Sequence, residues 1–392
     1  MKAAGLLMLL GATLCVASSL DRNHLFGKLT INPAHLKPIL AFVTTIAAAS
    51  IVQIATGSIG FHQDMTGEGV RVSPLAALTV AAIVPAAALT SFVWRRFDGW
   101  QRYLMLSVLI VLMMVQFYQG RRVFIYSLVV CLMCYFAANP PKRLFTLKNL
   151  LTFALSAALI MFASKAFFAM RMAVWELGST RDTVAMLSKG FDVLINAQDT
   201  GLDEEVAENQ KSRTFIIGYL AELVGALELQ EPLYGDVLVF DIAINVPSVL
   251  WPEKYKIIAL GVEESVANPH FGLSPEDDAN SIATAGAADF GIPGIFIYSL
   301  LQAGIYSVIL RNTRRFGAAG HLIIAASLAD SLLNVEGGVS QYLSTLRSLS
   351  IALIATYFLR LAYVWYSSKP SKSGSILSLA GMKRAIDRLK LS

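Results

Sequence analysis

Apolar stretches of about 20 residues alternate along the chain with short polar connections. The hydrocarbon core of a bilayer is about 30 Å thick, and a helix needs about 20 residues to cross it. A backbone in lipid must satisfy its own hydrogen bonds, which a helix does. The pattern therefore predicts an all-α, polytopic membrane helix bundle of about nine spans. The spans are expected at 3–20, 38–59, 74–94, 103–118, 123–138, 147–169, 288–310, 317–334 and 348–366.

The composition agrees with a membrane protein. Hydrophobic residues make up 55% of the 392 residues and charged residues only 15%, whereas soluble domains carry about 25% charged residues. Lys and Arg gather after the first, third, fifth and seventh spans and in the tail. Because cytoplasmic connections carry this excess, the N-terminus is expected outside and the C-terminus inside.

The two ends of the chain have their own patterns. The stretch 1–20 has a lysine, an apolar run and then small residues, which fits either a cleaved signal peptide or a retained helix. A retained helix is favoured, because cleavage would leave the basic segment 21–37 on the outer side. The basic tail 368–392 predicts an amphipathic helix on the anionic cytoplasmic leaflet.

One long segment, 171–286, is strongly acidic. It holds 19 of the 27 acidic residues and 7 of the 32 basic ones. It is too long for a simple connection, so we expect a large, partly helical extracytoplasmic loop. Amphipathic or re-entrant helices are expected within 213–229 and 234–254, and an exposed polar stretch at 192–210. The chain then divides into 1–170, 171–286, 287–367 and 368–392.

Several kinds of chemistry find no support in the sequence. The basic residues are scattered in short connections, which argues against nucleic-acid binding. Cys131 and Cys134 form a CxxC pair on a predicted span without a nearby histidine, so we interpret them as core residues. No phosphate-binding loop, HExxH or metal-ligand cluster is present. Neither a metal nor a cofactor is therefore predicted.

Four arginines are expected at the outer membrane interface. Arg121 and Arg122 form a short outer turn, Arg171 lies where the sixth span ends, and Arg213 begins an apolar helix of the acidic segment. Each one alone fits a helix end that reaches lipid head groups. Together with Lys165 on the sixth span and Arg347 at the start of the ninth, they predict a cationic site, because a guanidinium group can donate two parallel hydrogen bonds to phosphate oxygens.

A histidine and several acids follow in the same segment. His270, between Asn268-Pro269 and Phe271-Gly272, is placed to take a proton from a sugar hydroxyl. Asp277 and Asp278 are the alternative bases, and Glu222 is expected to bind sugar hydroxyls. A solvated acidic turn is the structural alternative for these acids. Farther along, Gly291, Pro293 and Gly294 predict a break in the seventh span.

Two stretches resemble a known family. "YGDVLVFDIAINVPSVLWPEK" (234–254) and "NSIATAGAADFGIPG" (280–294) are similar to runs in the Wzy-type polymerases of O-antigen and related repeat-unit polysaccharides. The resemblance implies a glycosyltransferase of the bacterial inner membrane that acts on undecaprenyl-pyrophosphate-linked oligosaccharides. It also implies a chain-length regulator and a flippase as partners. On this view Arg122, Arg171 and Arg213 bind the pyrophosphate, with Arg121 beside them, and His270 is the base.

Other functions remain open at this point. A ligase would move a finished glycan onto a lipid core. A transporter or flippase of lipid-linked sugars would carry more charges inside its spans and an internal repeat, and the sequence has few of the former and none of the latter. An assembly scaffold would explain the long segment but not the outer arginines.

Overall fold

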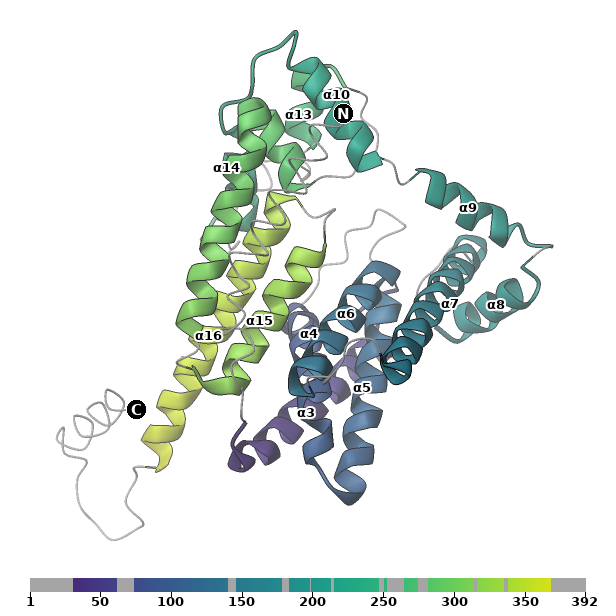
Figure 1. The fold of residues 1–392 in the computed structure, drawn as a ribbon, viewed down its shortest axis with the longest axis vertical. Coiled ribbons are helices and arrows are strands. Elements are labelled where there is room, and N and C mark those ends of the chain that lie inside the picture. Colours follow the sequence, from purple (N-terminus) through teal and green to yellow (C-terminus); the bar gives the residue numbers. More distant parts are fainter. Residues whose placement is uncertain are drawn as a thin grey trace, which may run out of the picture. The chain divides into compact units, whose positions relative to one another are not determined.

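The computed structural model is built of helices (Figure 1). It describes residues 31–61, 74–139, 146–177, 183–197, 199–212, 215–246, 250–251, 264–273, 281–313, 316–334 and 338–367, and no strand occurs among them. The chain divides into two compact units, Met1–Thr345 and Leu346–Ser392. The first unit contains every described helix up to α15 and the start of α16 (Val339–Ser367).

Six described helices are long and apolar enough to cross a membrane, which indicates a multi-pass membrane protein. They are α3 (Leu36–Ala55), α4 (Pro74–Val93), α5 (Gly99–Gln119), α6 (Arg121–Ala138), α7 (Leu147–Leu177) and α14 (Ile282–Thr313). Short 3-10 turns extend two of them, η1 (Pro33–His35) before α3 and η2 (Trp94–Arg96) after α4.

The predicted count of about nine spans is not confirmed. The stretch 3–20 and the tail 368–392 lie outside the described residues. The predicted span 317–334 corresponds to α15 (Gly317–Leu333), which is apolar but has only 17 residues. The last predicted span, 348–366, falls within α16, which is not among the six.

Helix α4 lies at the centre of the largest apolar core, where α3, α5, α6 and α15 pack against it. Its Ala86, Ala87 and Ala88 are fully buried. Small side chains let helices approach closely, and close packing is what holds helices together in lipid. Leu322 and Ala326 of α15 join the same core, so helices from before and after the acidic segment share one bundle.

Five described helices occupy the acidic segment: α8 (Thr183–Ile195), α9 (Leu202–Ser212), α10 (Phe215–Ala226), α11 (Asp236–Asn245) and α13 (Glu264–Phe271). Helix α8 lies alongside α7 (Figure 1). The prediction of an exposed polar stretch at 192–210 is wrong in part. Val193 and Leu202 are buried against Phe168 of α7, and the acidic Asp203 and Glu204 are exposed.

The predicted break in the seventh span is present in α14. Phe290 (φ −136°, ψ 17°) and Gly291 (φ 65°, ψ −155°) leave the helical conformation. Gly291 suits this place because only glycine adopts a positive φ freely. The break separates a first half-helix, Ile282–Asp289, from the longer remainder. A Cβ at Gly286 would lie 2.5 Å from the carbonyl oxygen of Gly294, so the two pieces touch backbone to backbone.

The first half-helix begins with a side-chain cap and is buried along its length. At its start the Thr284 amide donates to Ser281 Oγ (3.1 Å) and the Ser281 amide donates to Thr284 Oγ1 (2.7 Å), a reciprocal cap. Residues 283–289 are all buried. A short helix that is apolar on every side is stable only inside a protein, and α10, α11 and α13 supply that surrounding.

At its end, Asp289 links the broken helix to α11. The amides of Val237 and Leu238 donate to its two carboxylate oxygens, at 2.9 and 3.0 Å, and the Tyr298 hydroxyl donates to Oδ2. The N-cap residue of α11 is Gly235, which has no side chain to offer. Asp289 therefore caps α11 from a distant part of the chain, and its charge meets the positive end of the helix dipole.

The backbone beside Asp289 is tied to the same turn. The amides of Leu233 and Tyr234 donate to the carbonyls of Ala288 (2.9 Å) and Asp289 (2.8 Å), which the break in α14 leaves without helical partners. Tyr234 has a φ of 53°, which is unfavourable for a bulky residue. These hydrogen bonds hold it in that conformation.

Replacing Asp289 should destabilise the fold. Asp289→Ala removes the cap of α11 and leaves two amides, one buried and one partly buried, without acceptors, a loss of about 2–4 kcal/mol. Asp289→Asn keeps one acceptor and should lose less. Thermal unfolding of the purified protein in detergent measures both, and Asp192→Ala on the exposed face of α8 is the control. An Asp289→Ala variant as stable as the control would contradict the role of Asp289.

The contact between Gly286 and Gly294 should not tolerate a methyl group. In Gly294→Ala the new Cβ would overlap the carbonyl of Gly286, so the break must open and the melting temperature should fall. Gly304→Ala lies on the same helix with no atom within 4 Å of the added Cβ. It should be neutral or stabilising by up to about 1 kcal/mol, because alanine favours a helix. Equal effects of the two substitutions would argue against the close contact.

Candidate functional site

Helices α10, α11, α13 and the first half of α14 pack into one unit. Its apolar centre contains Tyr219, Leu223, Val237, Phe271 and Ala285. The Tyr219 hydroxyl donates to Asn268 Oδ1 across 2.7 Å in a buried setting, which fixes α13 against α10. We call these four elements the α10–α14 unit; it holds the predicted base on its surface.

His270 lies exposed near the end of α13, where its Nε2 is 2.8 Å from the carbonyl oxygen of Glu231. A carbonyl oxygen only accepts hydrogen bonds, so Nε2 carries the proton. In the neutral ring the lone pair then lies on Nδ1. The ring also packs edge-on against Phe271, with centroids 4.8 Å apart. Its orientation is therefore set by two contacts, and Nδ1 is the atom able to accept a proton.

The predicted acidic ligands are only partly described. Glu222 is exposed on α10, one turn after Tyr219. The Tyr219 hydroxyl bonds to Asn268 of α13, and Asn268 lies two residues before His270. The structure thus places Glu222 and His270 on neighbouring helices of the α10–α14 unit. Asp277 and Asp278 lie outside the described residues.

Two of the predicted arginines lie at one end of the α6–α7 pair. The guanidinium carbon of Arg121 is 4.4 Å from the ring centre of Phe168, and that of Arg171 is 4.5 Å from the ring of Trp175. Residues three apart on a helix are neighbours, so Phe168 and Arg171 share one turn of α7. Arg122 follows Arg121 in the first turn of α6 and is half-buried. Arg213 lies outside the described residues.

Lys165 does not join these arginines in a free cationic site. Its Nζ is 2.7 Å from Oδ1 of Asp203 on α9. Farther along α7, Glu176 pairs with Lys189 of α8 at 2.9 Å, and this hydrogen bond raises the pKa of Lys189. Such partly exposed pairs add little stability, and the buried contacts of Phe168 with Val193 and Leu202 hold α8 and α9 on α7.

A polar cluster links α6, α15 and α16 within the first unit. The Tyr126 hydroxyl approaches Oδ1 of Asn334 at 3.5 Å, and the Asn334 amide donates to Gln341 at 2.6 Å. Asp330, one turn before Asn334, has a buried carboxylate oxygen without a hydrogen-bond partner. Polar side chains inside a helix bundle commonly mark an aqueous or ligand path.

Two features of the structure were not predicted from the sequence. Asp289 lies inside the stretch that suggested the family, yet only its glycines and proline were singled out; an acid directly before a Gly/Pro break in an apolar run was the available signal. The second is α8. It leaves Val184, Leu187, Phe191 and Ile195 exposed at helical spacing, a pattern typical of a helix at a membrane surface.

No group of three or more metal-binding side chains occurs within the described part of the chain. Comparison with protein-family models, with curated proteins and with solved structures gave no match to this chain. The class that the helices define is that of multi-pass membrane proteins.

Proposed function

We propose that this chain is a membrane glycosyltransferase that polymerises undecaprenyl-pyrophosphate-linked oligosaccharide repeat units at the outer leaflet of the bacterial inner membrane. The observation that carries the proposal is the contact of 2.8 Å between His270 Nε2 and the Glu231 carbonyl oxygen. With Nε2 bonded to the Glu231 carbonyl, Nδ1 presents a lone pair at the surface of the α10–α14 unit. A general base needs that lone pair within reach of a hydroxyl proton.

The proposed reaction uses these groups as follows. A hydroxyl on the non-reducing end of one repeat unit attacks the reducing-end sugar carbon of the lipid-linked chain. Nδ1 of His270 takes the hydroxyl proton, the bond between that carbon and the pyrophosphate oxygen breaks, and undecaprenyl pyrophosphate leaves. Asp277 and Asp278 are the alternative bases, and Glu222 binds sugar hydroxyls.

The arginines bind the negatively charged pyrophosphate of the leaving group. Arg122 and Arg171 lie at the same end of the α6–α7 pair, and Arg213 precedes α10 in the sequence. Guanidinium groups held in place stabilise charge as it develops on the departing oxygen. The carboxylates of the segment 171–286 are acceptors suited to hydrogen bonds from sugar hydroxyls.

The His270 assignment predicts a loss of glycan chains. In cells whose own polymerase is deleted, His270→Ala and His270→Gln should abolish the ladder of long chains while the protein accumulates normally. His35→Ala, which removes an exposed histidine next to α3, should leave the ladder intact. Asp277→Asn and Asp278→Asn test the alternative bases. Normal ladders in both His270 variants would overturn this assignment.

The planar guanidinium of Arg171, and not only its charge, should stabilise the leaving pyrophosphate. Arg171→Gln should slow chain extension by about 100-fold, the usual cost of losing one donor to a developing anion. Arg171→Lys keeps the charge but loses the planar geometry that donates two parallel hydrogen bonds. Its rate of chain extension should lie between those of the wild type and Arg171→Gln. Arg95→Gln is the matched control, because Arg95 also stacks on aromatic rings, Trp94 and Tyr135, but on the predicted cytoplasmic side. Equal rates for Arg171→Gln and Arg95→Gln would remove Arg171 from the site.

A further inference from the structure

Two arginines stack on one tryptophan where α4 ends and α5 begins, in the stretch "WRRFDGWQRY" (94–103). The guanidinium carbon of Arg95 is 5.3 Å from the ring centre of Trp94, and that of Arg102 is 4.8 Å from the same ring. Arg95 also lies 5.1 Å from the ring centre of Tyr135, near the end of α6. We call these four residues the Trp94 cluster; it joins the adjacent ends of α4, α5 and α6.

The stacking leaves the hydrogen-bond donors of both guanidinium groups available. A guanidinium donates in its own plane, whereas a ring face attracts the cation without accepting these hydrogen bonds. Arg95 and Arg102 are both exposed. Among the described residues no acidic side chain forms an ion pair with either of them, and Asp98, the nearest acid in the sequence, is itself exposed. The Trp94 cluster thus presents two oriented cations whose charge no described side chain neutralises.

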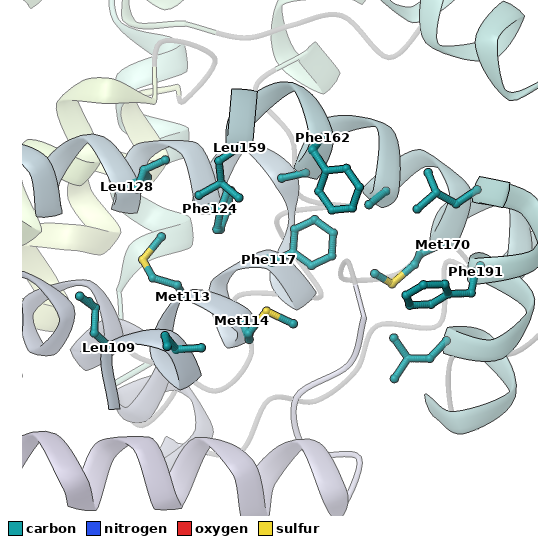
Figure 2. Close-up of a pocket in the computed structure, with 16 residues that line it drawn as sticks. Leu109, Met113, Met114, Phe117, Phe124, Leu128, Leu159, Phe162, Met170 and Phe191 are labelled. Carbon is teal, nitrogen blue, oxygen red and sulfur yellow. The ribbon is translucent and has the colours of Figure 1, made fainter. Parts of the chain in front are cut away.

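The surface of α5 places the Trp94 cluster at a membrane interface. Trp100 and Tyr103, in the first turns of α5, are 68% and 73% exposed, and exposed aromatic side chains of this kind gather at the level of lipid head groups. Farther along α5, Leu109, Met113 and Met114 line an apolar hollow between α5, α6, α7 and α8 (Figure 2). The cations therefore lie just before the part of α5 that suits hydrocarbon, at the depth of lipid phosphates.

We propose that the Trp94 cluster binds the phosphate of an anionic glycerophospholipid in the leaflet at the start of α5, which is the predicted cytoplasmic leaflet. Phosphate oxygens accept paired hydrogen bonds from a guanidinium. A zwitterionic head group fits less well, because its own ammonium group is repelled by the two cations.

The surroundings of the Trp94 cluster favour a phosphate that carries acyl chains over a soluble anion. Ile110 and Met114 are each at least 60% exposed on α5, and they provide an apolar surface along which the chains of the same lipid can lie. Because the lipid is a bound component and not a reactant, the site does not depend on the proposed glycosyl transfer.

The test uses the full-length protein, purified in detergent and mixed with equal amounts of phosphatidylglycerol and phosphatidylcholine. Native mass spectrometry should show about tenfold greater retention of phosphatidylglycerol, the range expected for a charged hydrogen bond. Arg102→Gln removes one of the two cations and should abolish most of this preference. Arg311→Gln, which removes an exposed arginine at the end of α14 on the same predicted side, is the matched control and should keep it.

A second pair of variants separates an oriented site from net charge alone. Trp94→Leu keeps every charge but removes the ring on which both guanidinium groups stack, so the preference should fall to about twofold or less as these groups lose their fixed positions. Trp100→Leu removes an exposed tryptophan from the next turn, on which no described cation stacks, and should keep the tenfold preference. Equal losses in Trp94→Leu and Trp100→Leu would overturn the proposal.

The unchanged protein provides a test that does not depend on the folding of any variant. Equal retention of phosphatidylglycerol and phosphatidylcholine by the wild type would overturn the proposal directly. Inorganic phosphate and a polyglutamate peptide should both fail to displace phosphatidylglycerol. Displacement by either one would assign the Trp94 cluster to a soluble anion or to an acidic protein, and would contradict the lipid assignment.

Discussion

The buried carboxylate of Asp289 is the interaction on which the α10–α14 unit depends. Burying a charge is costly unless hydrogen bonds replace its water, and Asp289 accepts from two α11 amides and from Tyr298. The break after Asp289 leaves the carbonyls of Ala288 and Asp289 without helical partners. The amides of Leu233 and Tyr234, in the turn before α11, donate to these carbonyls. The first half of α14 thus supplies the cap that α11 lacks, and the turn before α11 supplies donors for the last carbonyls of that half-helix.

The position of His270 follows from this junction. Once α11 is fixed to the first half of α14, Val237 and Ala285 belong to one core together with Tyr219 of α10 and Phe271 of α13. The bond from Tyr219 to Asn268 then sets α13, and the Glu231 carbonyl, in the connection before α11, sets the imidazole. The proposed base is therefore held by packing and hydrogen bonds that reach back to the break in a membrane-length helix.

Local properties of the sequence predicted part of this arrangement. Length and hydropathy located the six apolar helices, and Gly291 with Pro293 located the break, because each depends on neighbouring residues. The two α11 amides that donate to Asp289 lie about 50 positions away in the chain, and no periodicity reports such a contact. Likewise, the sequence predicted Lys165 as a cation at the membrane interface, because it gives no sign of the ion pair with Asp203 of α9. The roles proposed for His270, Glu222 and the arginines remain predictions.

The proposed glycan polymerase combines a broken helix, an oriented histidine and arginines predicted at the outer interface. Reconstitution of the purified wild-type protein in liposomes with an undecaprenyl-pyrophosphate-linked repeat unit tests it most directly, by electrophoresis of the glycan products. A polymerase should give a ladder of chains that differ by one repeat unit and lengthen with time. Movement of the lipid-linked unit across the bilayer without a longer product, or a single transfer to a lipid acceptor, would contradict it.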